Sequence, residues 1–205
     1  MLVEKSLKQF MDELASNAPV PGGGSVAALC GAVSSALASM VSALTVSNDK
    51  YLQVKGEMEG LLAASRKYID FFSEQIDRDA EAFDCVMKAY KMPKSTEEEK
   101  AARSRAIQDS LKKAAEVPMG VAEKALEAME FARLAVEKGN KNAVTDGAVA
   151  AMMARTAVLS ALYNVEINLA SIKDETYKKG MYQRIRELRE KAETKEKQIL
   201  EAVVI

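Results

Sequence analysis

The chain has 205 residues, of which 48% are hydrophobic and 29% are charged, and its net charge at pH 7 is −1. This length is enough for one well-filled core, whereas two domains would each have a small one, so a single domain over residues 1–205 is predicted. The balanced charge, the absence of Trp and an aromatic content of 5% disfavour nucleic-acid binding and attachment to anionic membranes.

The chain contains no His, which excludes Ser-His-Asp and Cys-His catalytic arrangements and His-ligated zinc sites. Acid-base chemistry would therefore use Asp, Glu, Lys, Tyr or Cys, and no metal site is predicted. Cys30 and Cys85 lie in apolar helical patterns without CxxC spacing, so free thiols are expected. The N-terminal segment has acidic residues and no continuous apolar run, so we expect a cytoplasmic protein without a signal peptide.

Helical periodicity runs along nearly the whole chain and no alternating strand pattern competes with it. The predicted fold class is therefore all-α, a single-domain helical bundle. A first helix should begin with a capping box at Ser6 and Gln9 and end near Asn17. Residues 18–25 read Ala-Pro-Val-Pro-Gly-Gly-Gly-Ser, and two Pro with three Gly predict a loop rather than helix interior.

Residues 25–47 carry no charge and consist mainly of Ala, Ser and Gly. Small residues recur at every fourth position, which lets another backbone approach closely: Ala27, Gly31, Ser35, Ser39 and Ala43. The length would suffice for a membrane span, but large apolar side chains are few. We interpret this segment as a buried Ala/Ser/Gly-rich helix that can also face a second subunit.

A long central helix is predicted over residues 51–90, with apolar residues in alternating steps of three and four. Asp79 falls in this seam between Ile76 and Phe83. A carboxylate there costs several kcal/mol unless it is paired or protonated, and burial raises its pKa toward the range useful for proton transfer. The alternative is a register-fixing residue paired with Arg or Lys, which the spacing alone favours.

The second half of the chain predicts further helices. Pro93 ends the long helix, and Ser95 with Glu98 matches a second capping box. The next helix should run to residue 116, where Val117-Pro118 predicts a kink or joint before a helix that ends at residue 138. Gly139 is expected to be a left-handed helix stop.

After that stop, Thr145 or Asp146 is expected to cap an apolar helix over residues 149–172. A charged amphipathic helix over residues 174–204 completes the bundle. Asn164 and Asn168 lie one turn apart on the apolar helix. Their amides can bind a heterocycle that carries donors and acceptors, or they can link helices.

The glycine loop is a second candidate binding element. Glycine backbone can approach a flat ligand closely, and free N–H groups at a helix start favour carbonyl or carboxylate oxygens. The loop is neither a Walker A loop nor a dinucleotide fingerprint. A tight turn that leads into a buried helix explains it equally well.

An ordered set of segments carries a resemblance to a known family: residues 18–28, 76–83, 92–94, 117–118, 139–140 with Asp146, and 164–169. With these the chain resembles the cyclodeaminase domain of formiminotransferase-cyclodeaminase and its free-standing bacterial relatives, some of which are methenyltetrahydrofolate cyclohydrolases. The resemblance covers nearly the whole chain. It implies an all-helical homodimer that converts 5-formiminotetrahydrofolate to 5,10-methenyltetrahydrofolate and releases ammonia, as an ammonia-lyase of histidine degradation that needs no cofactor.

The resemblance also implies a site. Asp79 is expected to be the catalytic residue, beside a glycine loop close to the folate. The expected substrate-binding residues are Pro21, Gly22, Gly23, Gly24, Ser25, Asp77, Asn140, Asp146, Asn164 and Asn168. Two other hypotheses remain: a methenyltetrahydrofolate cyclohydrolase, and a non-catalytic helical assembly module in which Asp79 only fixes register.

Overall fold

The computed structural model describes all residues 1–205 as helices and short connections, without a strand. Six α-helices form the fold: α1 Leu7–Leu14, α2 Gly23–Val46, α3 Lys55–Tyr90, α4 Glu97–Lys138, α5 Val144–Leu169 and α6 Glu175–Glu201. Three 3-10 helices accompany them: η1 Leu2–Glu4, η2 Asp49–Val54 and η3 Lys141–Ala143. The all-α prediction and the long central helix are confirmed.

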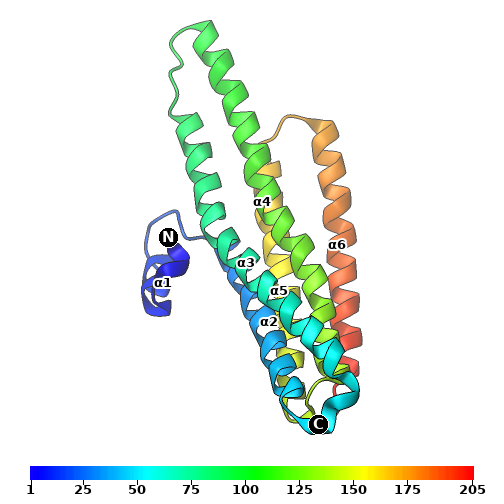
Figure 1. The fold of residues 1–205 in the computed structure, drawn as a ribbon. Helices are drawn as coiled ribbons and strands as arrows, with labels where there is room; N and C mark the ends of the chain where they lie inside the picture. Colours follow the sequence, from blue (N-terminus) through cyan, green and yellow to red (C-terminus); the bar gives the residue numbers. More distant parts are fainter.

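The helices form two layers (Figure 1). Helices α3, α4 and α6 lie in one layer and α2 and α5 in the other, with α1 to one side of the bundle. The turn between α3 and α4 extends beyond the other helices. Helices α2 and α5 run antiparallel, because Gly23 lies beside Asn164 and the Ser34 hydroxyl donates to the Ala150 carbonyl at 2.8 Å. This pairing brings the start of α2 to the C-terminal half of α5.

Small residues let α2 pack closely against its neighbours. Ala27, Gly31, Ser35 and Ser39 are buried, as the repeat of small side chains predicts. A Cβ on Gly31 would lie 2.7 Å from the ring of Phe72 on α3, so only glycine permits this approach. The prediction of a buried Ala/Ser/Gly-rich helix is therefore confirmed, except that Ala43 near its end is exposed.

Several predicted helix boundaries need correction. The capping box of α1 is present at Ser6 and Gln9, but α2 already begins at Gly23, so part of the glycine run is helical. The second capping box is formed by Thr96 and Glu99, one residue later than predicted. No joint occurs at Pro118, since α4 continues through it to Lys138.

The turn between α4 and α5 also differs from the prediction. Gly139 has φ −72° and ψ 173°, which is extended and not left-handed. Glycine is needed there for space, because a Cβ would lie 2.2 Å from the Ala135 carbonyl oxygen. Helix α5 begins at Val144, directly after η3, so neither Thr145 nor Asp146 is its cap.

Helix α2 and the segment Lys141–Leu169 are long and apolar enough to cross a membrane by length and composition. Half of the most apolar window of each is buried inside the bundle. Core helices of globular proteins meet the same two criteria, so this property alone does not indicate a membrane protein.

Candidate functional site

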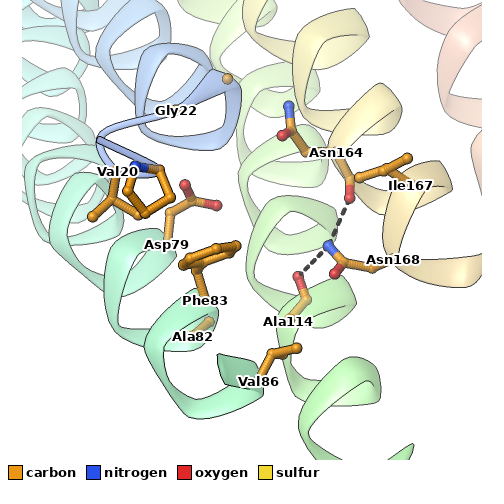
Figure 2. Close-up of a pocket in the computed structure, with 12 residues that line it drawn as sticks. Val20, Gly22, Asp79, Ala82, Phe83, Val86, Ala114, Asn164, Ile167 and Asn168 are labelled. Atoms are coloured by element: carbon orange, nitrogen blue, oxygen red, sulfur yellow. Dashed lines mark hydrogen bonds between the residues drawn. The ribbon is translucent and has the colours of Figure 1, made fainter. Parts of the chain in front are cut away.

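A pocket of about 290 Å³ opens where the start of α2 meets the C-terminal half of α3, the middle of α4 and the C-terminal half of α5. The loop before α2 contributes Pro19, Val20 and the N-cap residue Gly22, and α2 itself begins beside the pocket with Gly23. The apolar wall consists mainly of Ala82, Phe83, Val86, Ala114 and Ile167. The polar side chains are Asp79 from α3 and Asn164 and Asn168 from α5, which face the pocket from opposite sides (Figure 2).

Asp79 lies against the first turn of α2. A Cβ added to Gly24 would be 2.0 Å from Asp79 Oδ1, so the absence of a side chain at Gly24 creates the space for this carboxylate. The Ser25 hydroxyl lies 2.9 Å from the Ile76 carbonyl oxygen and 3.3 Å from Asp79 Oδ2. The glycine run and Ser25 therefore hold the carboxylate of Asp79 in place.

Burial raises the pKa of Asp79 above its usual value, and hydrogen bonds from the hydroxyl and N–H of Ser25 oppose that shift. No Arg or Lys forms an ion pair with this carboxylate, although fourteen ion pairs occur elsewhere in the protein. The alternative in which Asp79 fixes register by pairing with a cation is therefore not what this structure contains. A partly buried carboxylate with a raised pKa in a pocket is suited to general acid-base chemistry.

The two Asn residues contribute oriented amides. Asn164 Nδ2 donates to the Ser160 carbonyl at 2.8 Å. Asn168 Nδ2 donates to the carbonyls of Asn164 at 2.8 Å and Ala114 at 3.2 Å (Figure 2). Their side-chain oxygens accept no hydrogen bond from the protein, so each offers an acceptor to a ligand.

The remaining predicted site residues lie elsewhere in this chain. Pro21 is buried beside the pocket, after a cis Val20–Pro21 bond, and does not line it. Asp77 accepts hydrogen bonds from the backbone N–H groups of Leu2, at 2.6 Å, and Val3, at 3.4 Å. Its carboxylate therefore anchors the N-terminal segment instead of facing the pocket.

Asn140 and Asp146 lie at the opposite end of the bundle. The Asn140 N–H donates to Thr45 Oγ1 at 2.8 Å, and the Asn140 side chain caps η3. Asp146 is in the first turn of α5. Gly23 and Thr45 are separated by about 33 Å along α2 at 1.5 Å per residue, so neither the Asn140 nor the Asp146 side chain belongs to this pocket.

Sequence reasoning missed the apolar walls contributed by Ala114 and Ile167. Ile167 lies between the two Asn residues on α5 and is 70% exposed although it lines the pocket. The signal in the sequence was the position of Ile167, a large apolar residue that shares a helical face with Asn164 and Asn168. No group of three or more His, Cys, Asp or Glu side chains could hold a metal ion, and the absence of a cofactor stays a prediction.

Comparison with known proteins identifies the family. The family model for formiminotransferase-cyclodeaminase matches residues 6–187. The chain belongs to this family. A methenyltetrahydrofolate cyclohydrolase from Methylorubrum extorquens is 40% identical over 177 residues, which cover 86% of this chain and 85% of that protein.

Two further relatives show how the family is organised. The formimidoyltransferase-cyclodeaminase of Sus scrofa is 35% identical over 204 residues, which are 98% of this chain but only 37% of that protein. This chain therefore corresponds to about a third of the length of the pig protein. The crystal structure of a formiminotetrahydrofolate cyclodeaminase from Thermotoga maritima superimposes with a TM-score of 0.89 at 33% identity, covering 99% of this chain and 98% of that one.

Proposed function

We propose that this protein is a cyclodeaminase that converts 5-formiminotetrahydrofolate to 5,10-methenyltetrahydrofolate and releases ammonia. The observation that carries the proposal is Asp79, a carboxylate without a cationic partner that lines the pocket and has a raised pKa. The names of the pig and Thermotoga maritima relatives support the same activity.

The mechanism needs one group that moves protons. In the proposed reaction N10 of the folate attacks the formimino carbon on N5, while protonated Asp79 donates its proton to the imino nitrogen. The resulting carboxylate then takes the N10 proton and passes it to the amine, which leaves as ammonia with the electron pair of its C–N bond. Asp79 ends as a carboxylate and regains a proton from water. General acid-base catalysis of this kind contributes about 10²–10⁴-fold in rate.

The pocket also supplies positioning. The wall of Phe83, Val86 and Ile167 can pack against a flat heterocycle, and Asn164 and Asn168 can hydrogen-bond to its edge. Holding N10 against the formimino carbon lowers the barrier further by proximity. Of the residues that the sequence predicts to bind the substrate, Gly22, Gly23, Asn164 and Asn168 line this pocket.

A methenyltetrahydrofolate cyclohydrolase is the second candidate, because the relative that is 40% identical over most of its length has that name. It would add water to the methenyl bridge instead of expelling ammonia. Incubating the purified protein with each folate separates the two, with methenyl absorbance and ammonia followed together. Cyclodeaminase activity produces both from the formimino substrate, whereas loss of methenyl absorbance without ammonia supports the cyclohydrolase.

A third hypothesis, a non-catalytic assembly module, predicts that tetrahydrofolate derivatives do not stabilise the protein against heating. A folate-binding enzyme would gain stability by mass action. We propose that the protein acts in the cytoplasm, without a metal or redox cofactor, as an ammonia-lyase in histidine degradation.

We also propose that the protein is a homodimer. Helices α2 and α5 have no helix covering their outer side (Figure 1). Large apolar side chains are exposed along these two helices: Val33, Met40, Leu44, Val149, Met152, Tyr163 and Ile167. Exposed apolar surface of this extent marks an interaction site, and a second copy that presents the same face would cover it.

A further inference from the structure

Pro118 removes one hydrogen-bond donor from α4 beside the pocket. Helix α4 is continuous from Glu97 to Lys138, with Pro118 buried in its interior. Proline has no backbone N–H, and its ring displaces the carbonyl of the residue four positions earlier. That residue is Ala114, which lines the pocket, so its carbonyl lacks the usual partner within the helix.

Asn168 supplies the missing donor. Its Nδ2 lies 3.2 Å from the Ala114 carbonyl oxygen and 2.8 Å from the Asn164 carbonyl oxygen (Figure 2). Two carbonyl oxygens accept both amide hydrogens, which fixes the orientation of the amide, because the side-chain oxygen could donate to neither. The oxygen, Oδ1, is then the only group of this side chain left for a ligand.

We propose that Pro118 is a positioning residue. By freeing the Ala114 carbonyl, it holds the Asn168 amide in the orientation in which Oδ1 offers a hydrogen-bond acceptor to an N–H group of the ligand's heterocycle. This inference rests on the proposed function, since it concerns how the same pocket recognises a folate. It gives Pro118 a role in recognition although its own side chain does not line the pocket.

The physical consequence of replacing Pro118 is specific. In Pro118→Ala the alanine has the backbone N–H that proline lacks, and this N–H donates to the Ala114 carbonyl. The carbonyl then turns back toward the helix axis and away from Asn168. The helix itself gains a better residue, so the variant is expected to fold. The Asn168 amide loses one of its two partners and can rotate, and affinity for the ligand falls about fivefold, the value of one ordinary hydrogen bond.

The test is a double-mutant cycle measured by equilibrium binding of 5-formyltetrahydrofolate, a stable N5-substituted folate. The four proteins are the parent, Pro118→Ala, Asn168→Ala and the double variant, with Lys113→Ala on the exposed side of α4 as the matched control. Pro118→Ala should raise Kd in the parent background and have no further effect in the Asn168→Ala background. The KM for turnover should rise with Kd while kcat changes less, because Asn168 binds the heterocycle and moves no proton.

Each outcome decides between the two proposals. An equal effect of Pro118→Ala in both backgrounds, or no effect in the parent, overturns the positioning role while the proposed function stands. If the parent protein does not bind 5-formyltetrahydrofolate, the folate proposal itself fails. Unchanged far-ultraviolet circular dichroism and a melting temperature at or above that of the parent establish that Pro118→Ala is folded when Kd is measured.

Discussion

The carboxylate of Asp79 occupies the space that a side chain at Gly24 would fill, with 2.0 Å between Asp79 Oδ1 and the position of a Cβ. The start of α2 and the C-terminal half of α3 thus fit closely against each other at this point. Ser25, the next residue, reaches both the Ile76 carbonyl and Asp79. The glycine run therefore serves the placement of one acidic side chain as well as the turn into α2.

Gly24→Ala should inactivate the protein without unfolding it. The new methyl group must displace the Asp79 carboxylate or the first turn of α2, and a shift of about 1 Å at the reacting groups costs about 100-fold in rate. The measurement is kcat/KM for ammonia release. Gly60→Ala is the matched control, since nothing lies within 4 Å of its added Cβ on α3, and it should keep full activity and gain about 0.5–1 kcal/mol of stability. Parental activity in Gly24→Ala would refute this account of the glycine run.

Asp79→Asn should make the protein more stable at neutral and alkaline pH. The pKa of Asp79 is raised in the folded state by burial, so the folded protein binds this proton more tightly than the unfolded chain. The stability that Asp79 contributes is present below its unfolded pKa and is lost as the pH rises through its folded pKa. An amide has no such loss, so the melting temperature of the variant should exceed that of the parent above the folded pKa.

The difference in melting temperature between Asp79→Asn and the parent should shrink as the pH falls through the folded pKa of Asp79, because the side chain is then uncharged in both folded proteins. Thermal unfolding of the two proteins over a pH series measures it. A constant difference at all pH values, or a less stable variant at pH 8, would show that Asp79 does not carry a raised pKa.

The outer face of α2 and α5 should hold two subunits together. Val33 and Met152 are 39% and 45% exposed near the middle of this face, and Lys at both positions would bury charge in a dimer contact. The double variant is expected to elute as a monomer in light-scattering chromatography, whereas the parent is a dimer. Leu52→Lys is the control, because Leu52 is also exposed, at 62%, but lies in η2. A parental protein that is monomeric at micromolar concentration contradicts the proposed dimer.

Local spacing predicted part of the site and could not predict the rest. The seam of α3 put Asp79 among apolar residues, and the step of four put Asn164 and Asn168 on one face, and all three line the pocket. The resemblance places Asn140 and Asp146 at the same site, but they lie at the far end of the bundle because α2 and α5 run antiparallel. Which helix ends meet depends on packing between distant segments, and helical periodicity does not report it.

The continuity of α4 through Pro118 also depends on a contact between segments that are distant in the sequence. Pro118 predicts a kink when only its neighbours in sequence are considered. The freed Ala114 carbonyl is instead satisfied by Asn168, 54 positions later in the chain, and Pro118 is buried against the core. A tertiary hydrogen bond can thus compensate a local defect that sequence reasoning treats as the end of a helix.

The rate of ammonia release from 5-formiminotetrahydrofolate by Asp79→Asn tests the central claim most directly. The amide keeps the shape of Asp79 and can neither donate an acidic proton nor accept one from N10, so a fall in kcat of about 10²–10⁴-fold is expected, with folate binding retained. If Asp79→Asn releases ammonia at the parental rate, Asp79 is not the proton carrier of this pocket.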